Sequence, residues 1–225
     1  MNIFYIILAY LLGSIPFGYL ITKCSSKKNI LEIGWRKTSG SNVFRNVGKW
    51  QGVLTGILDV GKGFLAVWLA QKLGLSSEIQ IFSGVAAVTG HNWSCFLKFS
   101  GGRGIGTLFG VLGAIAPQIL GFSLIPLVIF FLLWTASVGT ILFLITGILL
   151  SIIFGQFWGA GLLLVLSLIP ITIKRLSPIE KIKKTEGKQK RNLIKNRLIF
   201  DQDTPPLPRI KKLSSYFKKR INPNL

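Results

Sequence analysis

Residues 98–107, KFSGGRGIGT, place four glycines around a single arginine, Arg103. Adjacent glycines allow backbone N–H groups to turn inward as an anion-binding nest, and the arginine fork suits phosphate oxygens. Thr107 can donate a further hydrogen bond at the start of the next helix, where the helix dipole also favours an anion. The spacing is not that of a P-loop, so a nucleoside triphosphate is not indicated.

The alternative interpretation of this stretch is a flexible turn whose arginine only sets membrane topology. The residues expected to bind a phosphate here are Gly101, Gly102, Arg103, Gly104 and Thr107.

A second polar stretch, residues 30–49, mixes apolar side chains with hydroxyls, an amide and cations. This composition suits an interfacial segment at the level of lipid head groups. Within it a Ser-Gly-Ser-Asn run precedes Arg45, so we expect a second anion-binding surface that includes Ser41 and Asn42. A plain cationic loop with an interfacial Trp35 is the alternative.

Three ionisable residues lie inside or beside apolar segments. Asp59 and Lys62 are three residues apart, so on a helix they share one face and can neutralise each other. His91, the one histidine of the chain, is either a general base or a hydrogen-bonded structural residue. We expect all three to shape a polar cavity. The sequence has no GxSxG nucleophile elbow and no HExxH motif, so neither a covalent serine nor a metal is expected.

The elements that must position these residues are membrane helices. The chain is 50% hydrophobic yet carries a formal charge of +20, and no Asp, Glu, Lys or Arg occurs between Arg103 and Lys174. That uncharged run is about 70 residues long, whereas one spanning helix needs only about 20. Glycine, proline and polar punctuation divide the apolar sequence into segments near 3–22, 52–71, 79–97, 104–116, 118–136, 138–155 and 157–173. We therefore predict an all-α integral membrane protein with about seven transmembrane helices.

The distribution of cations predicts the orientation of these helices. The loop over residues 23–50 holds seven cations against Glu32 alone, and cationic loops stay in the cytoplasm. The connections on the opposite side, at residues 71–78 and around 117 and 156, carry almost no positive charge. We expect an external N-terminus that begins a retained helix, because no cationic n-region of a signal peptide precedes it.

The tail from Lys174 contains sixteen Lys or Arg residues against four carboxylates. We expect a mostly solvated cytoplasmic segment near anionic lipid head groups. Nucleic-acid binding is the competing interpretation of such a tail, and membrane attachment argues against it. The predicted division is a polytopic membrane domain over residues 1–187 and a basic cytoplasmic tail over residues 188–225, which need not be ordered.

Four stretches carry a family resemblance. They are YLLGSIPFGY at residues 10–19, SNVFR with GK at residues 41–49, LDVGKG at residues 58–63, and GH through FLKFSGGRG to Thr107 at residues 90–107. Together and in this order they resemble the bacterial acyl-phosphate:glycerol-3-phosphate acyltransferases, integral membrane enzymes with seven spans. Four motifs in order over roughly residues 5–110 are far more specific than one. Beyond them the chain matches in hydrophobicity and in KTE at residues 184–186, which adds Glu186 to the expected cavity or structural residues.

The resemblance implies transfer of a fatty acyl group from acyl phosphate to the 1-hydroxyl of glycerol 3-phosphate, giving lysophosphatidate for phospholipid biosynthesis. Acyl phosphate would be a co-substrate, and no cofactor or metal is implied. Arg45 and Arg103 would be the catalytic residues. The implied partners are the lipid bilayer, acyl phosphate and glycerol 3-phosphate, with no nucleic acid. The implied protein is a monomer in the bacterial cytoplasmic (inner) membrane, multi-pass, with its active face cytoplasmic.

The chain departs from the family pattern at three places. When this sequence is aligned with the family pattern without a gap, Trp35 stands where the family has a functional serine. The family loop usually has lysine where Arg103 stands, and arginine has a different hydrogen-bonding geometry. Residues 175–178, RLSP, occupy the neighbourhood of a family histidine and asparagine. The chain is therefore predicted to be a divergent member. The alternatives are a catalytically silent paralogue that binds anionic lipid or regulates lipid synthesis and, third, a transporter.

Overall fold

The computed structural model describes residues 2–206, and this part of the chain is helical throughout apart from turns and one isolated bridge between Ser94 and Ser100. The N-terminal half comprises α1 (Asn2–Ser14), α2 (Phe17–Ser26), α3 (Gly40–Asn46), α4 (Lys49–Lys72), α5 (Ser77–Asn92) and a short 3-10 turn (Cys95–Leu97). The C-terminal half comprises α6 (Ile105–Ile115), α7 (Pro117–Leu133), α8 (Ala136–Ile153), a π-helical turn (Phe157–Gly161), α9 (Leu162–Leu176), α10 (Ile179–Lys183) and α11 (Gly187–Phe200). The all-helical class predicted from the sequence is confirmed.

Four helical segments within the described residues are long and apolar enough to cross a membrane: Ile3–Ser26, Lys49–Lys72, Ala136–Ile153 and Phe157–Leu176. Helices α6 and α7 are apolar but shorter, and α5 has 16 residues. Each of the seven predicted apolar segments is mostly helical, whereas their number as membrane crossings stays a prediction. Large apolar side chains cover the outward faces, among them Ile57 on α4, Ile152 on α8 and Ile169 on α9, as expected for helices in contact with lipid.

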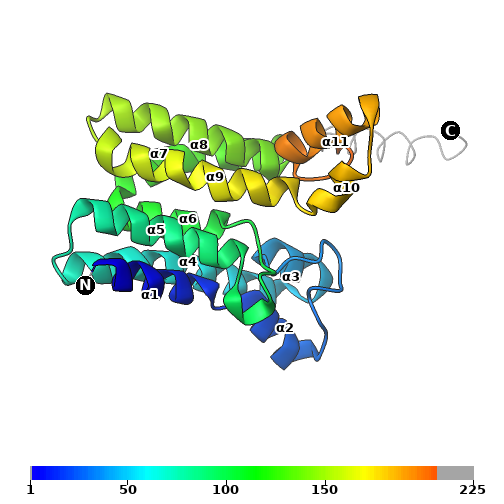
Figure 1. The fold of residues 1–225 in the computed structure, drawn as a ribbon, viewed down its shortest axis with the longest axis horizontal. Coiled ribbons are helices and arrows are strands. Elements are labelled where there is room, and N and C mark those ends of the chain that lie inside the picture. The colour runs from blue at the N-terminus through cyan, green and yellow to red at the C-terminus, as the bar shows by residue number, and fades with distance from the viewer. Residues whose placement is uncertain (1, 207–225) are drawn as a thin grey trace, which may run out of the picture.

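The helices form two layers (Figure 1), with α1, α4, α5 and α6 in one and α7, α8 and α9 in the other. The closest pairs are α4 with α6, α1 with α5, and α7 with α8. One cluster of fully buried side chains joins the layers, and it includes Val111 and Leu112 of α6, Phe143 of α8 and Leu163 of α9. Helix α6 is thus central, which fixes the position of its N-terminus.

Close approach between α4 and α6 depends on glycine. A methyl group at Gly63 would overlap the Thr107 carbonyl oxygen, and one at Gly110 would overlap the Val60 carbonyl oxygen. The two backbones therefore touch at both places, and this contact sets Asp59 and Lys62 of α4 beside the start of α6.

The first apolar segment is interrupted between α1 and α2. Pro16 has no N–H and disfavours helical geometry at Ile15 before it, so the helix ends at Ser14 and restarts at Phe17. The Ile15 carbonyl accepts a hydrogen bond of 3.1 Å from the Phe17 N–H and a second one of 2.9 Å from Lys62 Nζ. A lysine inside α4 thereby ties the break in the first segment to the second.

The polar segments gather at one end of the helices. Figure 1 shows α2, α3, α10 and α11 at the end opposite the N-terminus. Helix α11 begins at Gly187, next to the predicted domain boundary, and packs on α9 and α8. The division into a membrane domain and a tail stays a prediction, and residues 207–225 of that tail lie outside the described residues.

Candidate functional site

A cationic cavity of about 350 Å³ opens at the end of the helices where the polar segments meet. Its walls come from the loop before α3, the glycine-rich loop before α6, the end of α9 with the two residues after it, and the last turn of α11 with the residues that follow. The lining residues are Trp35, Lys37, Arg103, Arg175, Ser177, Pro178, Arg197, Asp201, Gln202, Asp203 and Thr204. Segments far apart in the sequence therefore bring four cations to one cavity.

The glycine-rich loop lies against the C-terminal end of α5. The Gly102 N–H donates to the His91 carbonyl at 3.0 Å, and a methyl group at Gly102 would overlap Nε2 of the His91 ring. Gly104 has φ +75° and is the N-cap of α6, a conformation that glycine adopts without the steric cost of a Cβ. These contacts fix the position of Arg103 between the two glycines.

The predicted cavity residues Asp59, Lys62 and His91 form a buried cluster beneath this loop. Lys62 Nζ lies 2.8 Å from Asp59 Oδ1, and His91 Nδ1 lies 3.3 Å from the same oxygen. The pairing of Asp59 with Lys62 that the spacing predicted is confirmed. Because the side chains are at most 6% exposed and Gly102 covers the His91 ring, the cluster supports the loop from below and does not line the cationic cavity.

Arg103 points to the tail. Its Nη2 lies 2.5 Å from Asp201 Oδ1, and Lys37 Nζ lies 3.1 Å from Asp201 Oδ2. Burial lowers the pKa of Lys37 to about 8; Asp201 raises it, whereas Arg103 and Arg175 lower it further. Burial is thus the main cause of the lowered pKa, and one carboxylate, Asp201, lies among three cations here.

Arg175, at the end of α9, completes the cavity. It is 7% exposed; its Nη1 donates to the Leu198 carbonyl at 2.6 Å and its Nη2 to the Ser137 carbonyl at 3.3 Å. Sequence reasoning did not single out Lys37, Arg175 or Asp201 as site residues. The available signals were cations that directly follow the uncharged run and a rare carboxylate in a basic tail.

The residues predicted for the second anion-binding surface lie on α3. Arg45 is exposed and stacks 4.7 Å from the centre of the Trp35 ring, and Ser41 is exposed as well. Asn42 is fully buried: its Oδ1 accepts from the Trp35 N–H, and its Nδ2 donates to the carbonyls of Ile33 and Lys37. Asn42 thus shapes the turn that carries Lys37, and the phosphate-binding roles of Ser41, Asn42 and Arg45 stay predictions.

The remaining predicted residues divide into two groups. Gly101 and Gly104 are buried in the loop, and Thr107 is buried in the first turn of α6 with no hydrogen-bond partner for its Oγ1 among the described residues. Glu186 is exposed at the N-cap of α11. The phosphate-binding role of the loop stays a prediction, and so does the role of Glu186. In the described part of the chain no three His, Cys, Asp or Glu side chains are grouped as a metal site.

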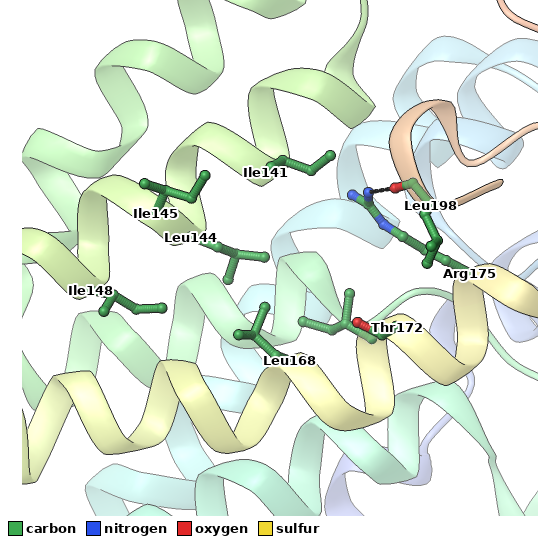
Figure 2. Close-up of a pocket in the computed structure, with 9 residues that line it drawn as sticks. Ile141, Leu144, Ile145, Ile148, Leu168, Thr172, Arg175 and Leu198 are labelled. Carbon is green, nitrogen blue, oxygen red and sulfur yellow. Dashed lines mark hydrogen bonds between the residues drawn. The ribbon is translucent and has the colours of Figure 1, made fainter. Parts of the chain in front are cut away.

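An apolar groove of about 150 Å³ runs between α8 and α9 and ends at the cationic cavity. Figure 2 shows its walls, formed by Ile141, Leu144, Ile145 and Ile148 of α8 and by Leu168 and Thr172 of α9, with Arg175 and Leu198 at one end. Arg175 lines both the groove and the cavity. The arrangement suits an amphiphile whose chain lies between the helices and whose anionic head meets the cations.

Comparisons with known proteins identify relatives. The family model described as glycerol-3-phosphate acyltransferase matches residues 3–185. Glycerol-3-phosphate acyltransferase of Prochlorococcus marinus (strain MIT 9312) is 40% identical over 131 residues, which cover 56% of this chain and 66% of the relative. The protein of the same name from Endomicrobium trichonymphae is 38% identical over 132 residues, covering 58% and 66%. The matched part thus spans just under two thirds of the length of these relatives.

The fold is similar to a solved membrane enzyme. The crystal structure of PlsY (YgiH), an integral membrane glycerol 3-phosphate acyltransferase, in its glycerol 3-phosphate form superposes with a TM-score of 0.70 at 31% identity, covering 81% of this chain and 92% of that one. Its lysophosphatidic acid form gives a TM-score of 0.67 at 32% identity, covering 81% and 91%. The family match ends at residue 185, before α11 begins.

Proposed function

We propose that this chain, which belongs to the glycerol-3-phosphate acyltransferase family, transfers a fatty acyl group from acyl phosphate to the 1-hydroxyl of glycerol 3-phosphate, giving lysophosphatidate. The observation that carries the proposal is the apolar groove that meets a cationic cavity at Arg175. An acyl phosphate has the same two parts, an apolar chain and a phosphate, joined at the carbonyl that reacts.

The cavity cations supply the electrostatics of the reaction. Arg103, Lys37 and Arg175 would hold the phosphate and neutralise the charge that develops as the hydroxyl oxygen bonds to the acyl carbon and the bond from that carbon to the phosphate oxygen breaks. Inorganic phosphate leaves, and the hydroxyl proton leaves with it. Because acyl phosphate is already activated, holding it beside the hydroxyl supplies much of the remaining rate gain. The proposal therefore includes no cofactor and no metal.

The departures from the family pattern support a remodelled site at the same place. Trp35, Arg175, Ser177 and Pro178 stand where the family resemblance is broken, and all four line the cationic cavity. In this chain the planar fork of Arg175 offers several donors to a phosphate. Arg175 would therefore supply hydrogen bonds in place of the family's histidine or asparagine.

The proposed topology has seven membrane crossings, an external N-terminus and a cytoplasmic active face. The cation-bearing helices α2, α10 and α11 gather at one end of the molecule, and cytoplasmic loops carry the excess of lysine and arginine. We place the protein in the bacterial cytoplasmic membrane. We also propose that it acts as a monomer, because residues of one chain complete the cavity.

The test is release of inorganic phosphate by the purified protein in detergent with acyl phosphate and glycerol 3-phosphate. We expect turnover that depends on both substrates, and a loss of about 10²-fold in kcat/KM for Arg103→Ala, the size typical for removal of one donor to a developing anion. Lys98→Ala is the matched control, because Lys98 is exposed beside the same loop and has no ion pair among the described residues. No release above a blank by folded protein would overturn the proposal.

A further inference from the structure

The last turn of α11 and the residues just after it, residues 197–203, contribute a carboxylate to the proposed phosphate site. Asp201 contacts both Arg103 of the glycine-rich loop and Lys37 of the loop before α3. It has φ +55° and is the C-cap of α11, so the chain turns sharply there and directs the carboxylate to the cations. Asp201 lies beyond the 3–185 family match, and this carboxylate is therefore an addition of this chain to the matched region.

The same segment contributes an apolar side chain to the proposed acyl site. Leu198, three residues before Asp201, lies at the end of the groove between α8 and α9. Figure 2 shows it beside Arg175, whose Nη1 donates to the Leu198 carbonyl. An apolar group in the groove and an anion among the cations, with Arg175 between them, reproduce the order of parts in an acyl phosphate.

Contacts on the far side of the segment hold it in this position. Arg197 is 4% exposed; its Nε lies 2.7 Å from Asp203 Oδ1, and its Nη1 donates to the carbonyls of Leu176 at 2.7 Å and Pro178 at 2.8 Å. Lys181 Nζ lies 2.6 Å from the second oxygen of Asp203. Asp203 is therefore engaged by other cations, and Asp201 alone faces Arg103 and Lys37.

The charges favour displacement of Asp201 by a phosphate. Asp201 brings one negative charge and two oxygens to a site that Arg103, Lys37 and Arg175 surround, whereas a phosphate group brings up to two charges and three free oxygens. The pKa of Lys37 is lowered to about 8 chiefly because burial disfavours its charged form, and further because Arg103 and Arg175 lie near it, so additional negative charge would stabilise its ammonium group. A phosphate therefore gains more from these cations than the carboxylate does.

We propose that residues 198–203 are an internal pseudosubstrate, which occupies the acyl-phosphate site in the resting protein and leaves when acyl phosphate binds. The proposal rests on the proposed function for the identity of the substrate. Because only the fraction of molecules with an open site binds substrate, the segment raises the apparent dissociation constant by the reciprocal of that fraction. The segment thus sets the acyl phosphate concentration at which the protein becomes occupied.

The test compares Asp201→Asn with Glu180→Gln, a matched neutralisation of an exposed carboxylate on α10. Binding of a long-chain alkyl phosphonate, a non-reacting amphiphilic anion, is measured by calorimetry in detergent. We expect Asp201→Asn to bind it roughly five- to tenfold more tightly than the unaltered protein, and Glu180→Gln to bind it as the unaltered protein does. Unchanged or weaker binding of the phosphonate by folded Asp201→Asn would overturn the proposal. Weaker binding is the result expected if Asp201 only positions Arg103 for the substrate.

A second measurement uses the unaltered protein and therefore does not depend on the folding of a variant. Trypsin cleavage after Arg197 requires exposure of a side chain that is buried against Leu176 and Pro178. We expect the phosphonate to accelerate this cleavage, followed by mass spectrometry, and protection by the phosphonate would refute displacement of the segment. Neither experiment uses turnover. Absence of acyl transfer together with tighter binding by Asp201→Asn would overturn the proposed function and leave the pseudosubstrate standing.

Discussion

Replacing Gly102 by alanine tests whether the buried cluster beneath the glycine-rich loop fixes the position of Arg103. The new methyl group would overlap His91 Nε2. His91 is 6% exposed and its Nδ1 lies 3.3 Å from Asp59, so the ring has little room to retreat. Ordinary contact between the two groups then requires the loop to lift by roughly 1 Å, and Arg103 is the next residue along it.

The magnitude follows from this displacement. A shift of about 1 Å in a positioning group costs about 10²-fold in rate, and overpacking of a closed contact costs about 1–3 kcal/mol of stability. We expect Gly102→Ala to lower kcat/KM for phosphate release by about 10²-fold and to lower the apparent unfolding temperature by several degrees. Fluorescence-detected thermal unfolding in detergent and the phosphate-release assay measure the two effects.

The matched control is Gly106→Ala, four residues later in the first turn of α6. A methyl group there meets its nearest neighbour, Asp59 Cβ, at 3.6 Å, which is an ordinary van der Waals contact. Both variants remove the same backbone freedom from the unfolded chain, so the difference between them isolates the contact with His91. Equal effects of the two substitutions would refute the argument that His91 supports the loop through Gly102.

Three further predictions concern the charges around the site. Asp59→Ala leaves Lys62 buried without its carboxylate, so we expect a loss of about 3–5 kcal/mol of stability, seen as a large fall in unfolding temperature; an unchanged temperature would contradict the buried pair. The pKa of Lys37 is lowered from its ordinary value of 10.5 to about 8 in the folded protein. Between these two pH values Lys37 is protonated in the unfolded chain and largely deprotonated in the folded one, so its contribution to stability rises with pH across that window. The Lys37 charge available to a phosphate is lost over the same window, so KM for acyl phosphate should rise above about pH 8, and Lys37→Arg should remove this inflection. Arg45→Ala removes an exposed cation that stacks on Trp35, and we expect a rise in KM for glycerol 3-phosphate with little change in unfolding temperature; kinetics identical to the unaltered protein would contradict a role for this surface in substrate binding.

Much of the helical arrangement could be predicted from the sequence, because its signals are local. The uncharged run after Arg103 predicts buried or lipid-facing helices, and glycine and proline mark their ends close to where α6, α7 and α8 end. The break after Ile15 was not predicted, because Pro16 lies within an otherwise continuous apolar stretch. The three-residue spacing of Asp59 and Lys62 gave their pairing directly, since neighbours on a helix face are set by its period.

The composition of the cavity could not be predicted in the same way. Lys37 and Asp201 are 164 residues apart, and no local pattern encodes a contact across that separation. Asn42 shows the converse: its sequence context suggested a ligand for phosphate, whereas its amide bonds to the backbone of the Lys37 turn. A motif can thus identify the region of a site while the side chains that line it are brought there by packing of distant helices.

The hydrogen bond from Lys62 to the Ile15 carbonyl has a consequence for the assembly of the protein in the membrane. Before α4 docks, the Ile15 carbonyl at the interruption has only the nearby Phe17 N–H as a partner, at 3.1 Å, and α4 carries the charged pair of Asp59 and Lys62, which is costly in hydrocarbon. Docking adds the bond from Lys62 to Ile15 and buries the pair, so it stabilises both long segments at once. We therefore expect the two segments to insert cooperatively, because Lys62 of α4 and the Ile15 carbonyl of the first segment bond to each other.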